Sequence, residues 1–328
     1  MKRLPVTGPV DPALGMVVLG EGSNGDILST TSRQGHTMAV KVMTPASDRE
    51  AAQVARDIEF SKHFTAHPGF IDVYATTDAE NVQAGRNAYI VMEQAAGDLT
   101  ELVIGRSMDE VPKATRIRLF IQVLGAVADM ARYGMMHRDL KPRNVLIKGD
   151  CAKGDCSAAL CDLATACSAR SKKWPCKELA GTACYIAPEV WKDGPAADTP
   201  ARDVWSLGIM LYQLLHGKLP AHLSRPSFND TMIFIRDDFR IEDDPTWRSS
   251  LASDKPLAEI VQRMLHRDPR SRITAEAALR QMPAYAAERG IHLDDRAEQD
   301  GWFKNLRRRI GQWFRDRWRE LPMPPWVN

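Results

Sequence analysis

The sequence of 328 residues lacks any uninterrupted apolar run of the roughly 18 residues that a membrane-spanning helix needs. Its first residues, MKRLPVTGPVDPALG, also lack the apolar segment of a secretory signal peptide, because prolines and glycines interrupt them. The formal net charge of +2 is too small to indicate a nucleic-acid partner for the chain as a whole. We therefore expect a cytoplasmic globular protein that does not bind nucleic acid.

Paired cysteine motifs are missing as well. All six cysteines lie between Cys151 and Cys184, and four to eight residues separate each one from the next. This spacing lacks the C-x2-C pairs of a zinc site, and a reducing cytoplasm disfavours disulfides. We predict isolated thiols, with a redox or metal role for the cluster as the alternative.

The apolar pattern changes after about the first third of the chain. Residues 14–43 form short apolar runs broken by Gly, Ser and Asn, as antiparallel hairpins do, and residues 89–93 predict another strand. Residues 47–65 predict a helix in which Ser47 is the N-cap and Glu50 completes a capping box. Longer apolar runs predict buried helices at 116–134 and 203–217. The sequence therefore predicts an α+β fold with a small antiparallel-β lobe that carries one helix and a larger, mostly helical lobe.

Gly20, Gly22 and Gly25 form a G-x-G-x-x-G string. Such a string is either a dinucleotide-binding turn or a flap over the phosphates of ATP. The dinucleotide turn must open directly into a helix, whereas Gly25 is followed by DILSTTS, whose β-branched residues favour a returning strand. The flap is the favoured interpretation.

A lysine follows in the strand-like run Met38-Ala39-Val40-Lys41-Val42. Strand alternation places Ala39 and Lys41 on one face, beneath the glycine flap. An inward lysine is costly unless it meets an anion, and nucleotide phosphates supply one. The alternative is a surface lysine on an edge strand.

The most specific string is HRDLKPRN at 137–144, which follows a buried helix and precedes the strand-like run 145–147. A second acid, Asp162, follows a later apolar run. In this order the motifs resemble the eukaryotic-type protein kinases over residues 13–285, and Lys141 together with Gly181-Thr182 resembles the serine/threonine branch. The resemblance implies a bilobal protein-kinase fold that transfers the γ-phosphoryl group of ATP, with Mg²⁺, to Ser or Thr hydroxyls of protein substrates.

The resemblance also implies a role for each matching residue. Lys41 would bind the α- and β-phosphates, and Asp139 would accept a hydrogen bond from the substrate hydroxyl. Lys141 would neutralise charge on the transferred group, while Asn144 and Asp162 would hold magnesium. The nucleotide contacts implied in the flap and around the adenine are Leu19, Gly20, Gly22, Gly25, Ile27, Ala39, Met92, Glu93, Ala95 and Leu146.

Two positions after Asp162 depart from the family pattern. Leu163 replaces a phenylalanine, and it can still fill an apolar slot beneath the small-lobe helix. Ala164 replaces a glycine and restricts positive φ, which would hinder a flip of this segment.

The family pairs the strand lysine with a glutamate of the small-lobe helix, about nine residues before an H-P pair that matches His67-Pro68. We assign this role to Glu59. Asp57 is the alternative, because the apolar positions Ile58, Phe60 and Phe64 fit the pattern better if it pairs with the lysine.

Arg138 precedes the catalytic aspartate, and in relatives this arginine commonly pairs with a phosphorylated residue of the activation loop. Glu178 matches the position of that residue, so its carboxylate could pair with Arg138 and hold the loop without phosphorylation. The alternatives are a solvated glutamate, or phosphorylation at Ser168 or Ser171. Thr182 belongs to the same regulatory segment.

Architectural residues match too. Glu189 resembles an acid that pairs with a buried arginine, here Arg272. Asp203 resembles an acid that ties the catalytic loop to a buried helix through backbone amides.

Outside the resemblance, residues 296–328 predict a basic amphipathic helix rich in tryptophan. It could pack on the large lobe, lie on a membrane surface, or bind an acidic-groove partner. We divide the chain into an extension (1–12), a small lobe (13–93), a large lobe (94–290) and this tail. A nucleotide-binding scaffold that acts through the tail is the alternative to an active kinase.

Overall fold

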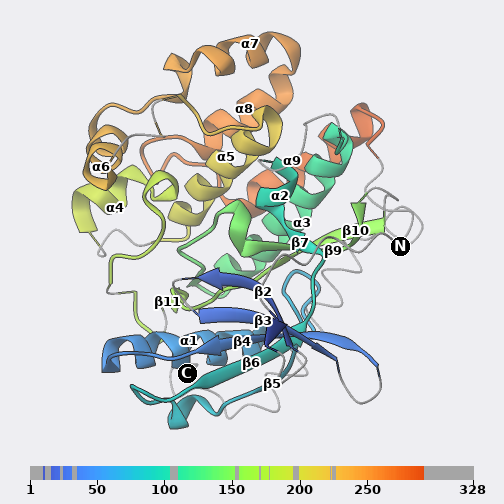
Figure 1. The fold of residues 1–328 in the computed structure, drawn as a ribbon. Coiled ribbons are helices and arrows are strands. Elements are labelled where there is room, and N and C mark those ends of the chain that lie inside the picture. Colours follow the sequence, from blue (N-terminus) through green and yellow to red (C-terminus); the bar gives the residue numbers. More distant parts are fainter. Residues whose placement is uncertain are drawn as a thin grey trace.

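The computed structural model confirms the predicted α+β fold of two lobes (Figure 1). The sheet of the small lobe and the helices of the large lobe lie on opposite sides of the catalytic segments. The predicted tail helix, 296–328, lies outside the described residues. Among the residues described, no helix combines the length and the apolar character that crossing a membrane requires. The structure describes residues 10–11, 16–22, 25–31, 35–103, 110–151, 155–169, 171–176, 178–194, 199–221, 223 and 227–291.

The small lobe is built on one antiparallel sheet with the strand order β1-β2-β3-β4-β6-β5. Gly25, which opens β3, has φ +120°, and a Cβ there would lie 2.2 Å from the carbonyl oxygen of Val42. Glycine is therefore required where β2 turns back into β3. The strands are β1 (Val10–Asp11), β2 (Met16–Gly22), β3 (Gly25–Thr31), β4 (Thr37–Met43), β5 (Val73–Thr76) and β6 (Ala88–Glu93).

One long helix, α1 (Asp48–Phe64), packs against this sheet, as predicted. The hydroxyl of Ser47 accepts a hydrogen bond from the amide of Glu50, and the Glu50 carboxylate accepts one from the amide of Ala46. The first bond satisfies a donor that the first helical turn leaves unpaired, and the second ties the preceding residue to the helix. A short 3-10 helix, η1 (Ala79–Asn81), lies in the connection between β5 and β6.

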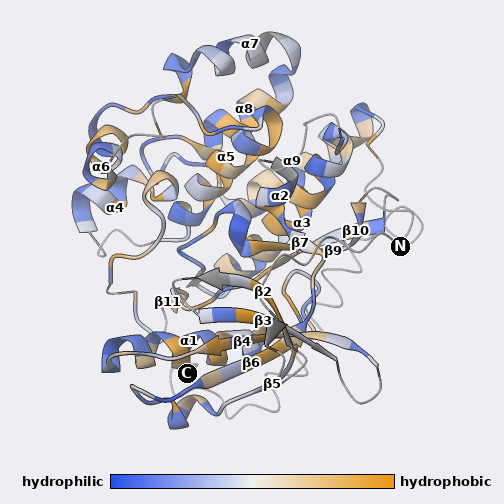
Figure 2. Ribbon diagram, in the orientation of Figure 1, coloured by the Kyte–Doolittle hydropathy of each residue, from blue (hydrophilic) through white to orange (hydrophobic). Residues whose placement is uncertain are grey.

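The large lobe is packed around two buried helices, α3 (Lys113–Arg132) and α5 (Ala201–His216). Nearly all faces of both are apolar, as the sequence predicts, and Figure 2 shows hydrophobic residues concentrated on the helices inside this lobe. The remaining helices are α2 (Leu99–Val103), α4 (Pro188–Asp193), α6 (Phe228–Asp237), α7 (Pro245–Ser253), α8 (Lys255–Met264) and α9 (Ala275–Glu288), with the 3-10 turns η4 (Ala183–Tyr185) and η6 (Ile241–Asp243).

Short strands between the lobes flank the catalytic motifs of the sequence. The hairpin of β9 and β10 pairs with β7, and β11 pairs with β8. The backbone bridge between Phe70 and Leu160 ties the end of β10 to the small lobe. These elements are β7 (Gly97–Asp98), β8 (Met135–Met136), η2 (Pro142–Asn144), β9 (Val145–Asp150), β10 (Asp155–Leu160) and β11 (Cys167–Ser168).

The prediction of isolated thiols is wrong for four cysteines, because the structure contains the disulfides Cys151–Cys156 and Cys167–Cys176. Cys156 lies opposite Gly149 in the β9–β10 hairpin, so the turn brings Cys151 back to it. After β11 the chain folds back on itself, which brings Cys176 to Cys167. Spacing along the sequence does not reveal either fold-back. Cys161 and Cys184 are free thiols.

The predicted pair of Arg272 and Glu189 is confirmed as a buried, two-pronged ion pair. Arg272 donates to both carboxylate oxygens, at 2.7 and 2.9 Å, and its side chain is 0% exposed. It also donates to the backbone carbonyls of Ala201 and His266. The pair joins α4 to the segment between α8 and α9.

Arg272→Met should lower the free energy of unfolding by about 3 to 5 kcal/mol, because it leaves the buried Glu189 carboxylate without its partner. Urea unfolding followed by circular dichroism measures this. The matched control is Arg280→Met, which removes an exposed pair with Glu276 and should cost at most about 0.5 kcal/mol. Equal losses in the two variants would contradict the assigned role of Arg272.

Candidate active site

Helix α5 holds the catalytic loop, residues 137–144. The Asp203 carboxylate accepts hydrogen bonds from the backbone amides of His137, at 2.7 Å, and Arg138, at 3.0 Å, as predicted. Burial raises the pKa of Asp203, while Arg202, His137 and the two amides oppose that rise. Arg138 has φ +70°, an unusual conformation for a residue with a side chain. Asp203 therefore fixes the loop in a shape that the chain alone would rarely adopt.

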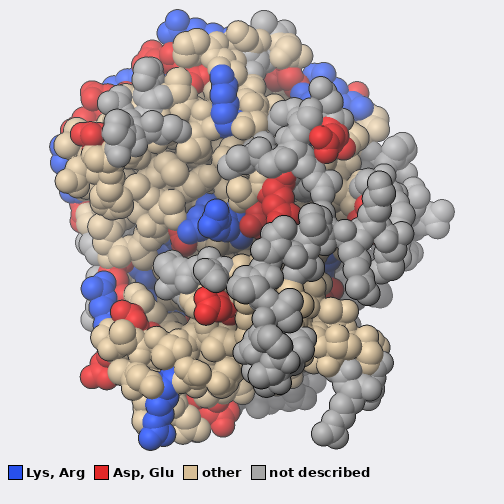
Figure 3. Space-filling view, viewed as in Figure 1, with Lys and Arg blue, Asp and Glu red and all other residues tan. Residues whose placement is uncertain are grey.

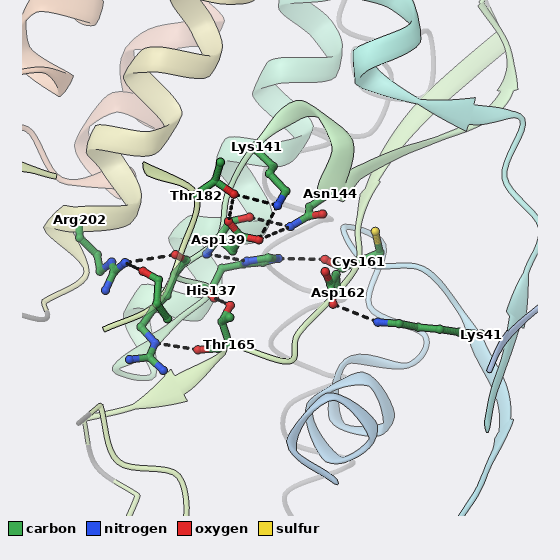
Figure 4. Close-up of polar contacts among 12 residues, drawn as sticks. Lys41, His137, Asp139, Lys141, Asn144, Cys161, Asp162, Thr165, Thr182 and Arg202 are labelled. Atoms are coloured by element: carbon green, nitrogen blue, oxygen red, sulfur yellow. Dashed lines mark hydrogen bonds and ion pairs between the residues drawn. The ribbon is translucent and has the colours of Figure 1, made fainter. Parts of the chain in front are cut away.

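Asp139 is the centre of a polar cluster in this loop (Figure 4). One carboxylate oxygen accepts from Lys141 Nζ at 2.8 Å, and the other accepts from the Thr182 hydroxyl at 2.7 Å. Lys141 also donates to Thr182 at 2.9 Å, which closes a triangle of three side chains. Asn144 donates to the Asp139 backbone carbonyl at 2.8 Å. The structure thus brings together four residues that lie up to 43 positions apart.

Gly181 allows Thr182 to reach this cluster. It has φ +114°, and a Cβ there would lie 2.5 Å from the carbonyl oxygen of Arg138. Any larger residue would push the segment away from the catalytic loop.

Lys41 lies between two carboxylates. Its Nζ is 2.7 Å from Asp57 of α1 and 3.0 Å from Asp162, which follows β10. Burial by itself lowers the pKa of Lys41, but the two carboxylates outweigh it and hold the pKa above its ordinary value. Lys41 is therefore a buried, charged ammonium, and the alternative of a surface lysine on an edge strand is excluded.

The assignment of Glu59 as the partner of Lys41 is wrong, and Asp57 is the partner. Asp57 shares one face of α1 with the buried Phe60 and Phe64, because residues three and seven positions apart lie above one another on a helix. Glu59 points to a different side, where its carboxylate accepts hydrogen bonds from Lys173 and from the indole of Trp174. The shorter aspartate reaches Lys41 because α1 packs close to the sheet.

The side chains assigned to the adenine share an apolar cluster between the lobes. Ala39 and Met92 pair across β4 and β6 and are buried, and Ile27 and Leu146 pack against the same cluster. Ala95 is half-buried, whereas Leu19 of β2 is 40% exposed. The Glu93 side chain forms an ion pair with Lys148 at 3.3 Å, a contact that the sequence analysis missed. Gly20, Gly22 and Gly25 lie in the β2–β3 hairpin beside these residues.

Comparisons with known proteins agree with this geometry. Residues 15–282 match the protein kinase domain. The chain belongs to the protein kinase family. It is 29% identical to calcium-dependent protein kinase 17 of Arabidopsis thaliana over 294 residues, which cover 83% of this chain and 51% of that protein. It is 31% identical to CDPK-related kinase 3 of the same plant over 269 residues, covering 79% and 40%.

A more distant organism supplies a similar match. Serine/threonine-protein kinase PAK mbt of Drosophila melanogaster is 28% identical over 263 residues, covering 80% of this chain and 38% of that protein. The chain thus spans about half or less of the length of these curated relatives. Membership of the family implies the use of ATP and a divalent metal ion.

Asn144 and Asp162 fit a metal site in this kinase fold. The amide of Cys161 donates to the backbone carbonyl of Asn144 at 3.1 Å, so Asp162 lies next to Asn144. The side-chain nitrogen of Asn144 donates hydrogen bonds to Asp139, so the side-chain oxygen of Asn144 is the atom that could bind a metal. Oxygen ligands of this kind suit a hard divalent cation whose remaining positions are filled by phosphate and water. The described residues contain no group of three or more His, Cys, Asp or Glu side chains that could hold a metal by itself.

The departures at Leu163 and Ala164 change little in this arrangement. Leu163 is 2% exposed within the core, as predicted, and its amide donates to Asp57 at 2.8 Å. The residue with positive φ is Asp162, at +61°, whereas Ala164 has an ordinary backbone conformation. The replacement of glycine by alanine at 164 is therefore compatible with the observed segment.

The predicted contact between the Glu178 carboxylate and Arg138 is not observed. Arg138 instead donates to the backbone carbonyls of Thr165, at 2.7 Å, and Glu178, at 2.8 Å. The Glu178 carboxylate lies 3.7 Å from Arg56 of α1. Arg138 is 2% exposed, and the chain turns the carbonyl rather than the side chain of Glu178 toward it.

The two free thiols lie beside the catalytic residues. Burial raises the pKa of Cys161, and the Asp162 carboxylate adds to that effect. Burial raises the pKa of Cys184 to about 11, while Lys141 opposes the rise. Both groups are therefore protonated near neutral pH and are poor nucleophiles.

Iodoacetamide should alkylate Cys161 and Cys184 far more slowly in the intact protein than in the urea-unfolded chain, where a thiol has a pKa of about 8.5. Between pH 7 and 9.5 the rate at Cys184 should rise about tenfold for each pH unit, since its thiolate fraction still lies far below saturation. Peptide mapping by mass spectrometry measures both rates. Equal rates in intact and unfolded protein at pH 7.5 would contradict the raised pKa of Cys184.

Proposed function

We propose that the protein is a serine/threonine protein kinase that transfers the γ-phosphoryl group of ATP, with Mg²⁺, to Ser or Thr hydroxyls of protein substrates. The observation that carries this proposal is the closed cluster of Asp139, Lys141 and Thr182, held next to the bridge from Lys41 to Asp162. Figure 3 shows basic and acidic side chains adjacent to each other in the middle of the face, where the two lobes meet.

Asp139 can orient the attacking hydroxyl. Oδ2 accepts bonds from Lys141 and Asn144, whereas Oδ1 accepts one bond, from Thr182, and so keeps a further lone pair. A substrate hydroxyl donating to that lone pair would have its own oxygen turned toward the phosphoryl group and would lose its proton to Asp139. Thr182 and Lys141 hold the carboxylate still during this step.

The two lysines provide the positive charge. Lys41 donates two of its three N–H groups to Asp57 and Asp162, which leaves one for the nucleotide phosphates. Lys141, 2.8 Å from Asp139, would neutralise the charge of the transferred group. Magnesium, when held by Asn144 and Asp162, would supply further charge neutralisation at the phosphates.

The alternative of a nucleotide-binding scaffold is less well supported. A scaffold without activity would be expected if the replacements after Asp162 disturbed the site or if α1 supplied no acid to pair with Lys41. Asp57 supplies that acid, and Leu163 is buried in the core. All the groups that phosphoryl transfer needs from the chain are thus present.

Activity without phosphorylation of the activation loop is part of the proposal. Arg138 donates hydrogen bonds to two backbone carbonyls, and Arg56 forms an ion pair with the Glu178 carboxylate. Together these contacts do the work that a loop phosphate would do. A membrane or acidic-groove partner for the tail at 296–328 and a cytoplasmic location remain predictions.

Asp139→Asn should lower phosphate transfer from labelled ATP to a mixed protein substrate by about 10² to 10⁴-fold, because the amide cannot take the hydroxyl proton. The matched control is Asp243→Asn at an exposed position, 70% accessible, which should keep full activity. Equal transfer by the wild type and Asp139→Asn would reject the proposed function. Magnesium removal by a chelator should abolish transfer in the wild type.

A further inference from the structure

A disulfide closes a small loop within the activation segment. Cys167 and Cys176 are nine positions apart, and Cys167 belongs to β11. Inside the loop, Ser168 donates its amide to the carbonyl of Trp174, and the amide of Trp174 donates to the hydroxyl of Ser171, both at 3.0 Å. The cross-link and these bonds hold Trp174 in one position.

That position places Trp174 on α1. Its indole nitrogen donates to Glu59 at 2.6 Å, and the guanidinium of Arg56 lies 5.2 Å from the centre of its ring. Lys173 forms an ion pair with the same Glu59 carboxylate. This is why Glu59, which does not contact Lys41, nevertheless has two partners in a distant segment.

Arg56 extends this contact along the activation segment. It donates to the carbonyl of Ala164 at 3.5 Å and lies 3.7 Å from the carboxylate of Glu178. Burial lowers the pKa of Arg56, and Glu178 opposes that fall. The surface of α1 that contacts the activation segment is thus made by Arg56 and Glu59, which lie before and after Asp57 in the chain. Movement of this turn of α1 would move Asp57 away from Lys41.

The two sulfur atoms of the bond differ in accessibility. Cys176 is half-buried, whereas Cys167 is 0% exposed. A thiolate from outside can therefore reach the sulfur of Cys176 more readily than that of Cys167. The second disulfide, Cys151–Cys156, closes the β9–β10 hairpin, and Figure 1 shows that hairpin and β11 on opposite sides of the molecule.

We propose that the Cys167–Cys176 disulfide is a redox switch of the kinase. When the bond is closed, the loop presents Trp174 to Arg56 and Glu59 and keeps α1 where Asp57 meets Lys41. When the bond is opened, Trp174 leaves α1, the bridge from Asp57 to Lys41 loosens, and phosphoryl transfer slows. Trp174 is on this account a positioning residue that acts through α1.

The opening reaction uses a dithiol as reductant. One thiolate of the dithiol attacks the sulfur of Cys176, and Cys167 leaves as a thiolate that takes up a proton. The second thiol of the dithiol then attacks the mixed disulfide and releases Cys176 as a thiol. Two electrons and two protons pass to the protein, and the dithiol becomes a cyclic disulfide.

The experiment compares the oxidised full-length protein with the same protein treated with dithiothreitol, with intact mass reporting the state of both bonds. Reduction should lower kcat about 10- to 100-fold, because a displacement of about 1 Å can cost that much. Cys176→Ser should show the lowered rate with or without the reductant. The matched control Cys151→Ser/Cys156→Ser should keep both the full rate and the full response.

Trp174→Phe isolates the indole contact. It keeps the disulfide and an aromatic ring but removes the donor to Glu59, so the oxidised variant should lose part of its rate with little change in melting temperature. A wild-type rate that is unchanged after both bonds open would overturn the switch, and so would a Cys176→Ser variant that still responds to the reductant.

A second readout does not depend on catalysis, although the rate measurements rest on the proposed function. In hydrogen–deuterium exchange, reduction should increase exchange of the amides of α1 and of residues 167–178 in the wild type and not in Cys176→Ser. If oxidised wild type is no more active than Asp139→Asn, the proposed function fails and the exchange data alone decide the switch. Unchanged exchange of α1 upon reduction would overturn it.

Discussion

A buried ammonium group between two carboxylates is the interaction on which the active site depends. Lys41 comes from the sheet, Asp57 from α1 and Asp162 from the segment after β10. None of these three charges could remain in the interior alone, because taking an unpaired charge out of water is costly. The three elements must therefore meet for any of them to be stable, and their meeting forms the nucleotide side of the site.

The large lobe holds a strained catalytic loop in one conformation. Asp203 ties two consecutive amides of the catalytic loop to α5, and the second of these residues, Arg138, has a positive φ. Gly181 permits the close approach that lets Thr182 reach Asp139. A site that must orient a hydroxyl needs such support, because small displacements cost rate. The small lobe thus contributes Lys41 and Asp57 to the buried ion pairs, and the large lobe contributes Asp139 as a firmly held hydrogen-bond acceptor.

The contacts of residues in specific sequence strings were predictable. Asp139, Lys141, Asn144 and Asp203 lie where the resemblance implied, because each belongs to a specific string whose match fixes its place in the fold. Glu59 was assigned on chemical type, although the apolar positions of α1 favoured Asp57. Helical phase outweighs the length of the side chain when the helix can pack closer.

The remaining differences arise from how the activation segment folds back. A carboxylate at Glu178 predicts an ion pair, yet the backbone of that residue faces Arg138 and its side chain faces Arg56. The disulfides depend on the same kind of fold-back, which no spacing of cysteines reveals. Trp174 carried no sequence signal beyond being a large aromatic in a basic loop. Such features follow from tertiary contacts and not from local pattern.

The most direct test of the central bridge is a double-mutant cycle on the free energy of unfolding, using Lys41→Met and Asp57→Asn. Because the two side chains form a direct buried ion pair, the effects of the two changes should be coupled by about 0.5 to 3 kcal/mol. The same cycle with Lys41→Met and Glu59→Gln should be additive within about 0.5 kcal/mol. Additive losses for Lys41 and Asp57, or coupling of Lys41 to Glu59 instead, would contradict the account.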